Sequence, residues 1–191
     1  MIVRQRLIAS AIVVALLQIA FLSWMIAGRA MTLRNGQDVL LKVEPVDPRD
    51  LLRGDYVQLG YDISTIPEKI VENMPEDPQT VAAGPIYVRI NKDADGFWRP
   101  VSASLGQPST TARREGEIDI RGNVLSRWGD DVLRVTYGIE RFYLPEDEGK
   151  AIERDMRVRS FGIVASIDAD GTAQIKALMD GETKLFEEPP Y

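Results

Sequence analysis

The sequence predicts a mainly β protein with one N-terminal transmembrane helix, and three observations lead to that prediction. The run Leu7–Ala27 contains no charged residue. After it, short runs that alternate apolar and polar residues recur between glycine, proline and aspartate turns, as is typical of half-buried strands. Segments with helical periodicity are scarce in that part. We therefore expect a membrane anchor over residues 1–30 and a β-rich extracytoplasmic domain after it.

The apolar run is long enough for one membrane crossing. Its 21 residues reach about 30 Å at about 1.5 Å per residue, which matches one hydrocarbon core. Gln18 is the only strongly polar residue in its middle, and Trp24 suits an interfacial position. A cleaved signal peptide and a buried core helix stay open as alternatives, although the apolar region of a signal peptide usually has about 7–15 residues.

Charges near the run favour an orientation with the N-terminus inside. Arg4, Arg6 and the terminal amino group precede the run, and Arg29 and Arg34 follow it. The positive-inside rule then places residues 31–191 outside the cytoplasm. The chain has no cysteine, which is compatible with an oxidising compartment.

Composition excludes several kinds of function. The chain contains no histidine and no cysteine, so common zinc and copper ligands and the commonest general base are missing. We expect no metal and no cofactor. Residues 31–191 carry 20 basic and 29 acidic residues, a balance that disfavours a nucleic-acid partner because phosphate binding needs a positive surface.

Eight strands and two short helices are expected after the anchor. Alternation is clearest at "YVQLGYDI", where Val57, Leu59, Tyr61 and Ile63 share an apolar face. The predicted strands cover 39–46, 56–63, 85–91, 97–105, 116–125, 131–144, 158–167 and 172–179. The predicted helices cover 67–74 and 146–156.

The two halves of this region resemble each other at a spacing of about 75 residues. "GDYVQLGYDI" (54–63) matches "GDDVLRVTYGI" (129–139), and "DADG" occurs at 93–96 and at 168–171. We predict duplicated β-units at 31–105 and 117–191, joined by a linker at 106–116. Two alternatives stay open: a chance match of common turn dipeptides such as Gly-Asp and Asp-Gly, and a single domain over residues 31–191. The two "DADG" segments are interpreted as hairpin turns, because a calcium loop would need a glutamate further along.

The stretch "GDYVQLGY" contains the clearest motif. Gly54 and Asp55 are typical of a turn, with Asp55 bonding to backbone N–H groups, and Leu59 and Tyr61 should be buried beside Val57. Tyr56 lies on the opposite face, where it could meet a partner. We assign no catalytic residue. A site built from paired carboxylates among Asp47, Asp50, Asp55 and Asp62, or from a Ser-Lys pair, is the competing hypothesis.

A second notable stretch is "YGIERFYLPEDEG" (137–149). As a strand it would place Ile139, Arg141 and Tyr143 on one face. Arginine and tyrosine are common at protein interfaces, so we predict a partner surface that contains Tyr56, Arg141 and Tyr143.

These features resemble a known family. A single N-terminal span, "PVDPRDLLR" and then "GDYVQLGY" are similar to the GDYXXLXY family of bacterial membrane-anchored proteins, with matches at Gly54, Asp55, Tyr56, Leu59 and Tyr61. The resemblance implies a single-pass protein of the bacterial cytoplasmic (inner) membrane whose bulk lies in the periplasm. It implies no biochemical activity. We expect a non-enzymatic module that contacts the lipid bilayer and a membrane or envelope protein; the alternative is an envelope hydrolase.

Overall fold

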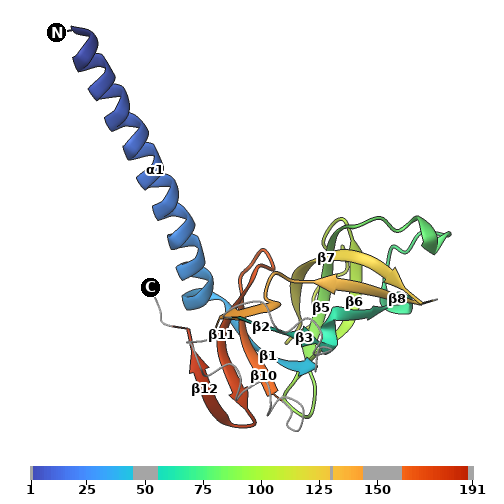
Figure 1. Ribbon diagram of the computed structural model, residues 1–191. Coiled ribbons are helices and arrows are strands. Elements are labelled where there is room, and N and C mark those ends of the chain that lie inside the picture. The colour runs from blue at the N-terminus through green and yellow to red at the C-terminus, as the bar shows by residue number, and fades with distance from the viewer. Residues whose placement is uncertain (1, 45–55, 130, 144–160, 189–191) are drawn as a thin grey trace.

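The computed structural model describes residues 2–44, 56–129, 131–143 and 161–188. One long helix, α1 (Ile2–Asn35), precedes two five-stranded antiparallel sheets and a two-stranded ribbon (Figure 1). The predicted fold class, an apolar N-terminal helix followed by a β-rich region, is therefore confirmed.

The helix α1 projects away from the β-region (Figure 1). The most apolar 18-residue window within Gln5–Asn35 has a mean hydropathy of 2.3, and none of that window is buried against the rest of the chain. By length and composition the helix could cross a membrane, and a signal sequence near the N-terminus would have the same properties.

The C-terminal end of α1 packs closely on the β-region. The Thr32 hydroxyl donates a hydrogen bond to the Asp168 carboxylate over 3.0 Å, and the Ser166 hydroxyl donates to the Thr32 carbonyl over 2.6 Å. Gly36 follows the helix, and a Cβ there would lie 2.6 Å from the Thr32 carbonyl oxygen and 2.9 Å from that of Ile167. Only glycine fits this close approach without a shift of the backbone.

The first sheet has the order β12-β11-β10-β1-β3 and the second has the order β4-β8-β7-β5-β6. The strands of the first are β1 (Gln37–Glu44), β3 (Gly60–Tyr61), β10 (Phe161–Ile167), β11 (Ala173–Asp180) and β12 (Thr183–Glu187). Those of the second are β4 (Thr65–Pro67), β5 (Gly84–Lys92), β6 (Trp98–Leu105), β7 (Ile118–Trp128) and β8 (Val132–Thr136). The ribbon pairs β2 (Tyr56–Gln58) with β9 (Arg141–Tyr143).

The two sheets share one strand order. The series β11-β10-β1-β3 in the first corresponds to β6-β5-β7-β8 in the second. Each sheet therefore joins a hairpin from one half of the chain to strands from the other half. The two "DADG" segments close these corresponding hairpins, each with a glycine N–H to aspartate carbonyl bond of 3.0 Å. A duplicated ancestor would produce this arrangement, and the division at 106–116 stays a prediction.

Several predicted elements need correction. The strand expected over 56–63 is interrupted, because η2 (Asp62–Ser64) forms a 3-10 turn after β3. The strand expected over 131–144 breaks at Gly138, whose φ of 82° is unfavourable for other residues. The helix expected over 67–74 is wrong: only η3 (Glu68–Ile70) is helical there.

The tertiary structure explains the missing helix. Ile66 and Val71 are buried in the core, and the Glu72 N–H donates to the Ala103 carbonyl of β6 over 2.8 Å. These contacts hold the segment against β6, an edge strand of the second sheet, as a short 3-10 turn followed by a β-bridge at Val71. The helix expected over 146–156 lies outside the described residues, and β12 was not anticipated.

One hydrophobic core joins both sheets. Buried residues alternate along β1 at Val39, Leu41 and Val43, and along β7 at Ile120, Gly122 and Val124. These two strands occupy corresponding places in their sheets. The period of two in the sequence therefore reports the inner face of each sheet.

Candidate functional site

The described part of the signature motif contributes Leu59 and Tyr61 to the hydrophobic core. Leu59 and Tyr61 expose only 2% and 1% of their surface, so their predicted burial is confirmed. Gly54 and Asp55 lie outside the described residues, as does the side chain of Val57. The described part of the motif is a packing element.

Tyr61 and its counterpart Tyr137 exchange equivalent hydrogen bonds between the two halves. The Tyr61 hydroxyl donates to the Ile139 carbonyl over 2.6 Å, and the Tyr137 hydroxyl donates to the Ile63 carbonyl over 2.5 Å. In the shared Tyr-x-Ile sequence, each tyrosine hydroxyl therefore bonds to the isoleucine carbonyl of the other half. Burial, followed by the charge of Glu140, raises the pKa of both phenols well above 10, so both stay neutral donors.

The backbone around these tyrosines forms one antiparallel crossing. Tyr56–Gln58 pair with Arg141–Tyr143, and Thr65–Pro67 pair with Val132–Arg134. Between them the Leu59 N–H donates to the Glu140 carbonyl over 2.8 Å. The segment 56–67 therefore runs antiparallel to 132–143, as expected if a local two-fold relates the halves.

The predicted partner surface falls on the ribbon. Tyr56 is the register partner of Tyr143, and Gln58 is the partner of Arg141. Arg141 is exposed, whereas the side chains of Tyr56 and Tyr143 lie outside the described part. Ile139 does not share a face with Arg141, contrary to the predicted alternation: it is 3% exposed, because the turn at Gly138 interrupts the strand.

Two neighbouring pockets lie between α1 and the β-region. The helix pocket, about 640 Å³, is lined by Met25, Ile26, Arg29, Thr32, Asp168 and Gln174, among others. The ribbon pocket, about 350 Å³, is lined by Arg29, Ile139, Arg141, Phe142, Gln174 and Glu188, among others. Arg29 and Gln174 line both pockets. Because Arg141 lines the ribbon pocket together with Arg29, Arg141 lies near the C-terminal end of α1.

Sequence reasoning missed the contribution of α1 to these pockets. Arg29 was treated only as a flanking charge and Asp168 only as a turn residue. The position of Arg29 just after the apolar run was a visible signal. The pairing of that helical turn with the second "DADG" hairpin depends on a contact between segments more than 130 residues apart, which no local pattern reports.

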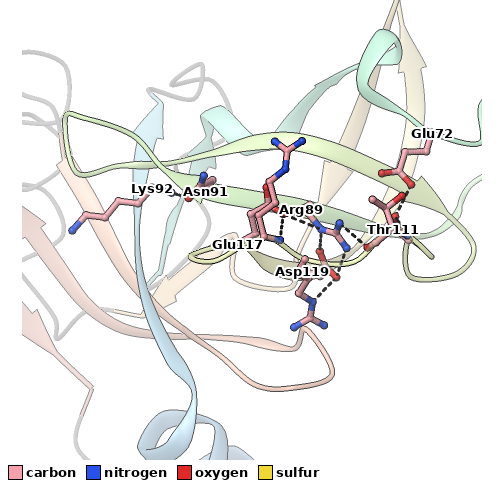
Figure 2. A network of polar contacts seen from close by, with 10 residues as sticks. Glu72, Arg89, Asn91, Lys92, Thr111, Glu117 and Asp119 are labelled. Carbon is pink, nitrogen blue, oxygen red and sulfur yellow. Dashed lines mark hydrogen bonds and ion pairs between the residues drawn. The ribbon is translucent and has the colours of Figure 1, made fainter.

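A buried polar network lies on the second sheet (Figure 2). Arg89 Nε donates to Asp119 over 2.8 Å, and Arg89 also donates to the Thr111 carbonyl over 2.9 Å. Arg113 adds a second contact to Asp119 at 3.0 Å. Burial alone would raise the Asp119 pKa, but the hydrogen bond and charge of Arg89, together with Arg113, lower it. The carboxylate therefore stays ionised and holds the 106–116 segment on the sheet.

Asp62 is the one carboxylate proposed for acid–base work that the described residues include. Both of its oxygens are buried without a hydrogen-bond donor in the described part of the chain. Burial raises its pKa; the nearby Ile63 amide and Arg99 oppose this, and Glu44 adds to it. Asp47, Asp50 and Asp55 lie outside the described residues, and Asp62 does not line the two pockets above. Of the four aspartates proposed for a carboxylate pair, only Asp62 is therefore placed, and the carboxylate near it is that of Glu44.

The described side chains contain no candidate metal site, and two of the described lysines pair with carboxylates. Among them, no group of three aspartates or glutamates is arranged to hold a metal ion. Lys176 pairs with Asp38 over 2.7 Å and Lys184 with Glu187 over 2.8 Å. Both ammonium groups are thus engaged by carboxylates.

Comparison with known proteins identifies the family. No curated protein and no solved structure matches the chain. The model of the family described as "GDYXXLXY protein" matches residues 18–178, which include the end of α1, the signature and both "DADG" hairpins. The chain belongs to the GDYXXLXY family.

Proposed function

We propose that the protein is a non-enzymatic interaction module, held by α1 in the bacterial cytoplasmic membrane with its β-region in the periplasm. The partner is a membrane or envelope protein. One observation supports this most strongly: Arg141, on the predicted partner surface, lines the same pocket as Arg29, which follows the apolar part of α1. A surface so close to the end of the apolar helix would face molecules embedded in the same membrane.

The properties of α1 support anchoring. Its apolar residues are exposed to the surroundings rather than packed on the β-region. The uncharged stretch Leu7–Ala27 ends about 12 Å before Asn35, at about 1.5 Å per residue. Because Thr32 and Gly36 fix the helix end to β10, the β-region is held within that short distance of the membrane surface.

Topology has a direct test. A reporter that fluoresces only in the cytoplasm is fused after Tyr191 and expressed with the full chain. The proposed orientation predicts intact but dark protein. Bright fluorescence from intact protein would reverse the orientation and remove the periplasmic assignment.

Partner binding is tested by capture of the full-length protein from membranes in mild detergent. Arg141→Ala should reduce recovery of a stoichiometric partner, because the side chain is exposed on the ribbon. Arg134→Ala is the matched control, since Arg134 is an exposed arginine on β8, away from both pockets. Equal recovery with both variants, or no stoichiometric partner from the unaltered protein, argues against the module.

A hydrolase is the second candidate, and Asp62 favours it. A buried carboxyl group with a raised pKa has the property that a general acid needs. If Asp62 is catalytic, Asp62→Asn abolishes hydrolysis of a periplasmic substrate without loss of stability. The interaction module predicts unchanged partner capture by this variant.

A further inference from the structure

The helix pocket combines an apolar end with two opposite charges. Met25 and Ile26 belong to the exposed apolar face of α1. One helical turn further, Arg29 supplies a guanidinium, and the β10–β11 turn supplies the Asp168 carboxylate. Thr32 and Gln174 add neutral polar groups to the same lining.

The depth of the pocket matches the lipid headgroup layer, if α1 spans the membrane as proposed above. Met25 and Ile26 lie at the end of the uncharged stretch. Arg29 and Thr32 lie about 3 and 8 Å beyond Ala27, from the rise of about 1.5 Å per residue. The headgroup layer on each side is roughly 5–8 Å thick. The pocket therefore extends from the edge of the hydrocarbon into that layer.

Both charges retain capacity for a ligand. The Asp168 side chain is held by three donors: the Thr32 hydroxyl at 3.0 Å, the Asp170 N–H at 3.0 Å and the Thr172 N–H at 2.9 Å. An ionised carboxylate has about four acceptor positions. Arg29 is half exposed and contacts Glu188 through one nitrogen at 3.3 Å, whereas a guanidinium carries five N–H donors.

We propose that the helix pocket binds a zwitterionic phospholipid that carries a primary ammonium, as in phosphatidylethanolamine. The phosphate pairs with Arg29 and the ammonium with Asp168, while an acyl chain lies along Met25 and Ile26. A phosphate alone would suit Arg29 but would be repelled by Asp168. The pocket, with one charge of each sign, is complementary to a headgroup with both.

The test uses the purified full-length protein, freed of lipid in mild detergent and examined by native mass spectrometry. Dioleoyl-phosphatidylethanolamine, -phosphatidylcholine and -phosphatidylglycerol are titrated separately. One phosphatidylethanolamine should bind per chain, with an affinity about tenfold above the other two, as expected for one charge-assisted contact. Phosphatidylcholine lacks the N–H donors, and phosphatidylglycerol lacks the cation.

Two variants assign the contacts. Asp168→Asn should remove the preference for phosphatidylethanolamine, and Arg29→Gln should weaken all three lipids. Asp93→Asn is the control for Asp168→Asn, because Asp93 occupies the corresponding place in the β5–β6 turn, which does not line the pocket. Equal binding of the three lipids, or a preference unchanged in Asp168→Asn, overturns the proposal.

This inference rests on the anchoring part of the proposed function, and the same spectrum separates the two. The intact mass reports whether α1 is retained. Loss of α1 from the mature chain refutes the anchor. A retained α1 without headgroup preference refutes the lipid site alone and leaves partner capture to be judged by Arg141→Ala.

Discussion

The two sheets follow one strand order but receive different segments. In the first sheet α1 enters at β1, and in the second the polar segment 106–116 enters at β7. The register pair Leu40–Val164 of the first corresponds to Asp119–Arg89 of the second. The ionic pair holds Thr111 and Arg113 of the entering segment, whereas the helix is held by its own end through Thr32. The two sheets therefore differ in how the entering segment is held: by a buried ionic pair in the second sheet, and by hydrogen bonds at the helix end in the first.

The largest expected effect comes from breaking the ionic pair. Asp119→Ala leaves the Arg89 guanidinium buried without its main partner, and the loss of a single partner of a buried pair costs about 3–5 kcal/mol. The double variant Arg89→Val/Asp119→Leu reproduces the apolar pair of the first sheet and should recover most of that loss. Urea unfolding of the three proteins gives the comparison. A double variant no more stable than Asp119→Ala would show that the two sheets are not interchangeable at this position.

Truncation of core side chains should lower the free energy of unfolding in both halves of the antiparallel crossing formed by residues 56–67 and 132–143. Leu59 and its counterpart Val135 are both 2% exposed. Leu59→Ala should cost about 2–5 kcal/mol, and Val135→Ala should cost less because fewer carbon atoms are removed. The free energy of unfolding from denaturant titration measures both. A negligible change in the free energy of unfolding of Leu59→Ala would show that the signature leucine does not stabilise the core.

Asp62 should give a smaller effect of opposite sign. Its pKa is raised by burial, so the folded state is favoured by the protonated form. Its contribution is present below the unfolded pKa and is lost as the pH rises through the folded pKa. Asp62→Asn should therefore raise the melting temperature at pH 7 and have little effect near pH 3. Gly138 occupies the corresponding place in the other half, so no compensating carboxylate is present there. A lower melting temperature of the variant at pH 7 would contradict the burial argument.

Sequence predicted the strands well where one face is buried. Leu59, Tyr61 and Ile63 were recognised by their period of two, and the "DADG" hairpins by their turn residues. The strand β12 was missed because most of its residues are exposed and its pattern does not alternate. The helix expected at 67–74 followed local propensity, which the burial of Ile66 and Val71 overrides.

The candidate sites were less predictable, for a physical reason. The shared Tyr-x-Ile sequence was visible, but the exchange of hydrogen bonds between halves depends on how the strands pair. The two pockets require the end of α1 to meet β10 and β11, and Asp62 is buried where its 3-10 turn packs on β1, β6 and β8. These are non-local contacts, and local periodicity carries no information about them.

The signature residue Tyr61 is a structural element equivalent to Tyr137. Tyr61→Phe and Tyr137→Phe each remove one buried donor, at a cost of about 1–3 kcal/mol. The raised pKa of both phenols favours the folded state below pH 10, and this contribution is lost as the pH rises further, so each variant should also weaken the alkaline loss of stability.

Thermal unfolding of the two full-length variants, measured with partner capture on the same preparations, separates a structural role of Tyr61 from a functional one. We predict equal decreases in melting temperature, with capture following stability in both. Loss of partner capture in Tyr61→Phe alone, at an unchanged melting temperature, would contradict this equivalence and make the signature tyrosine a functional group.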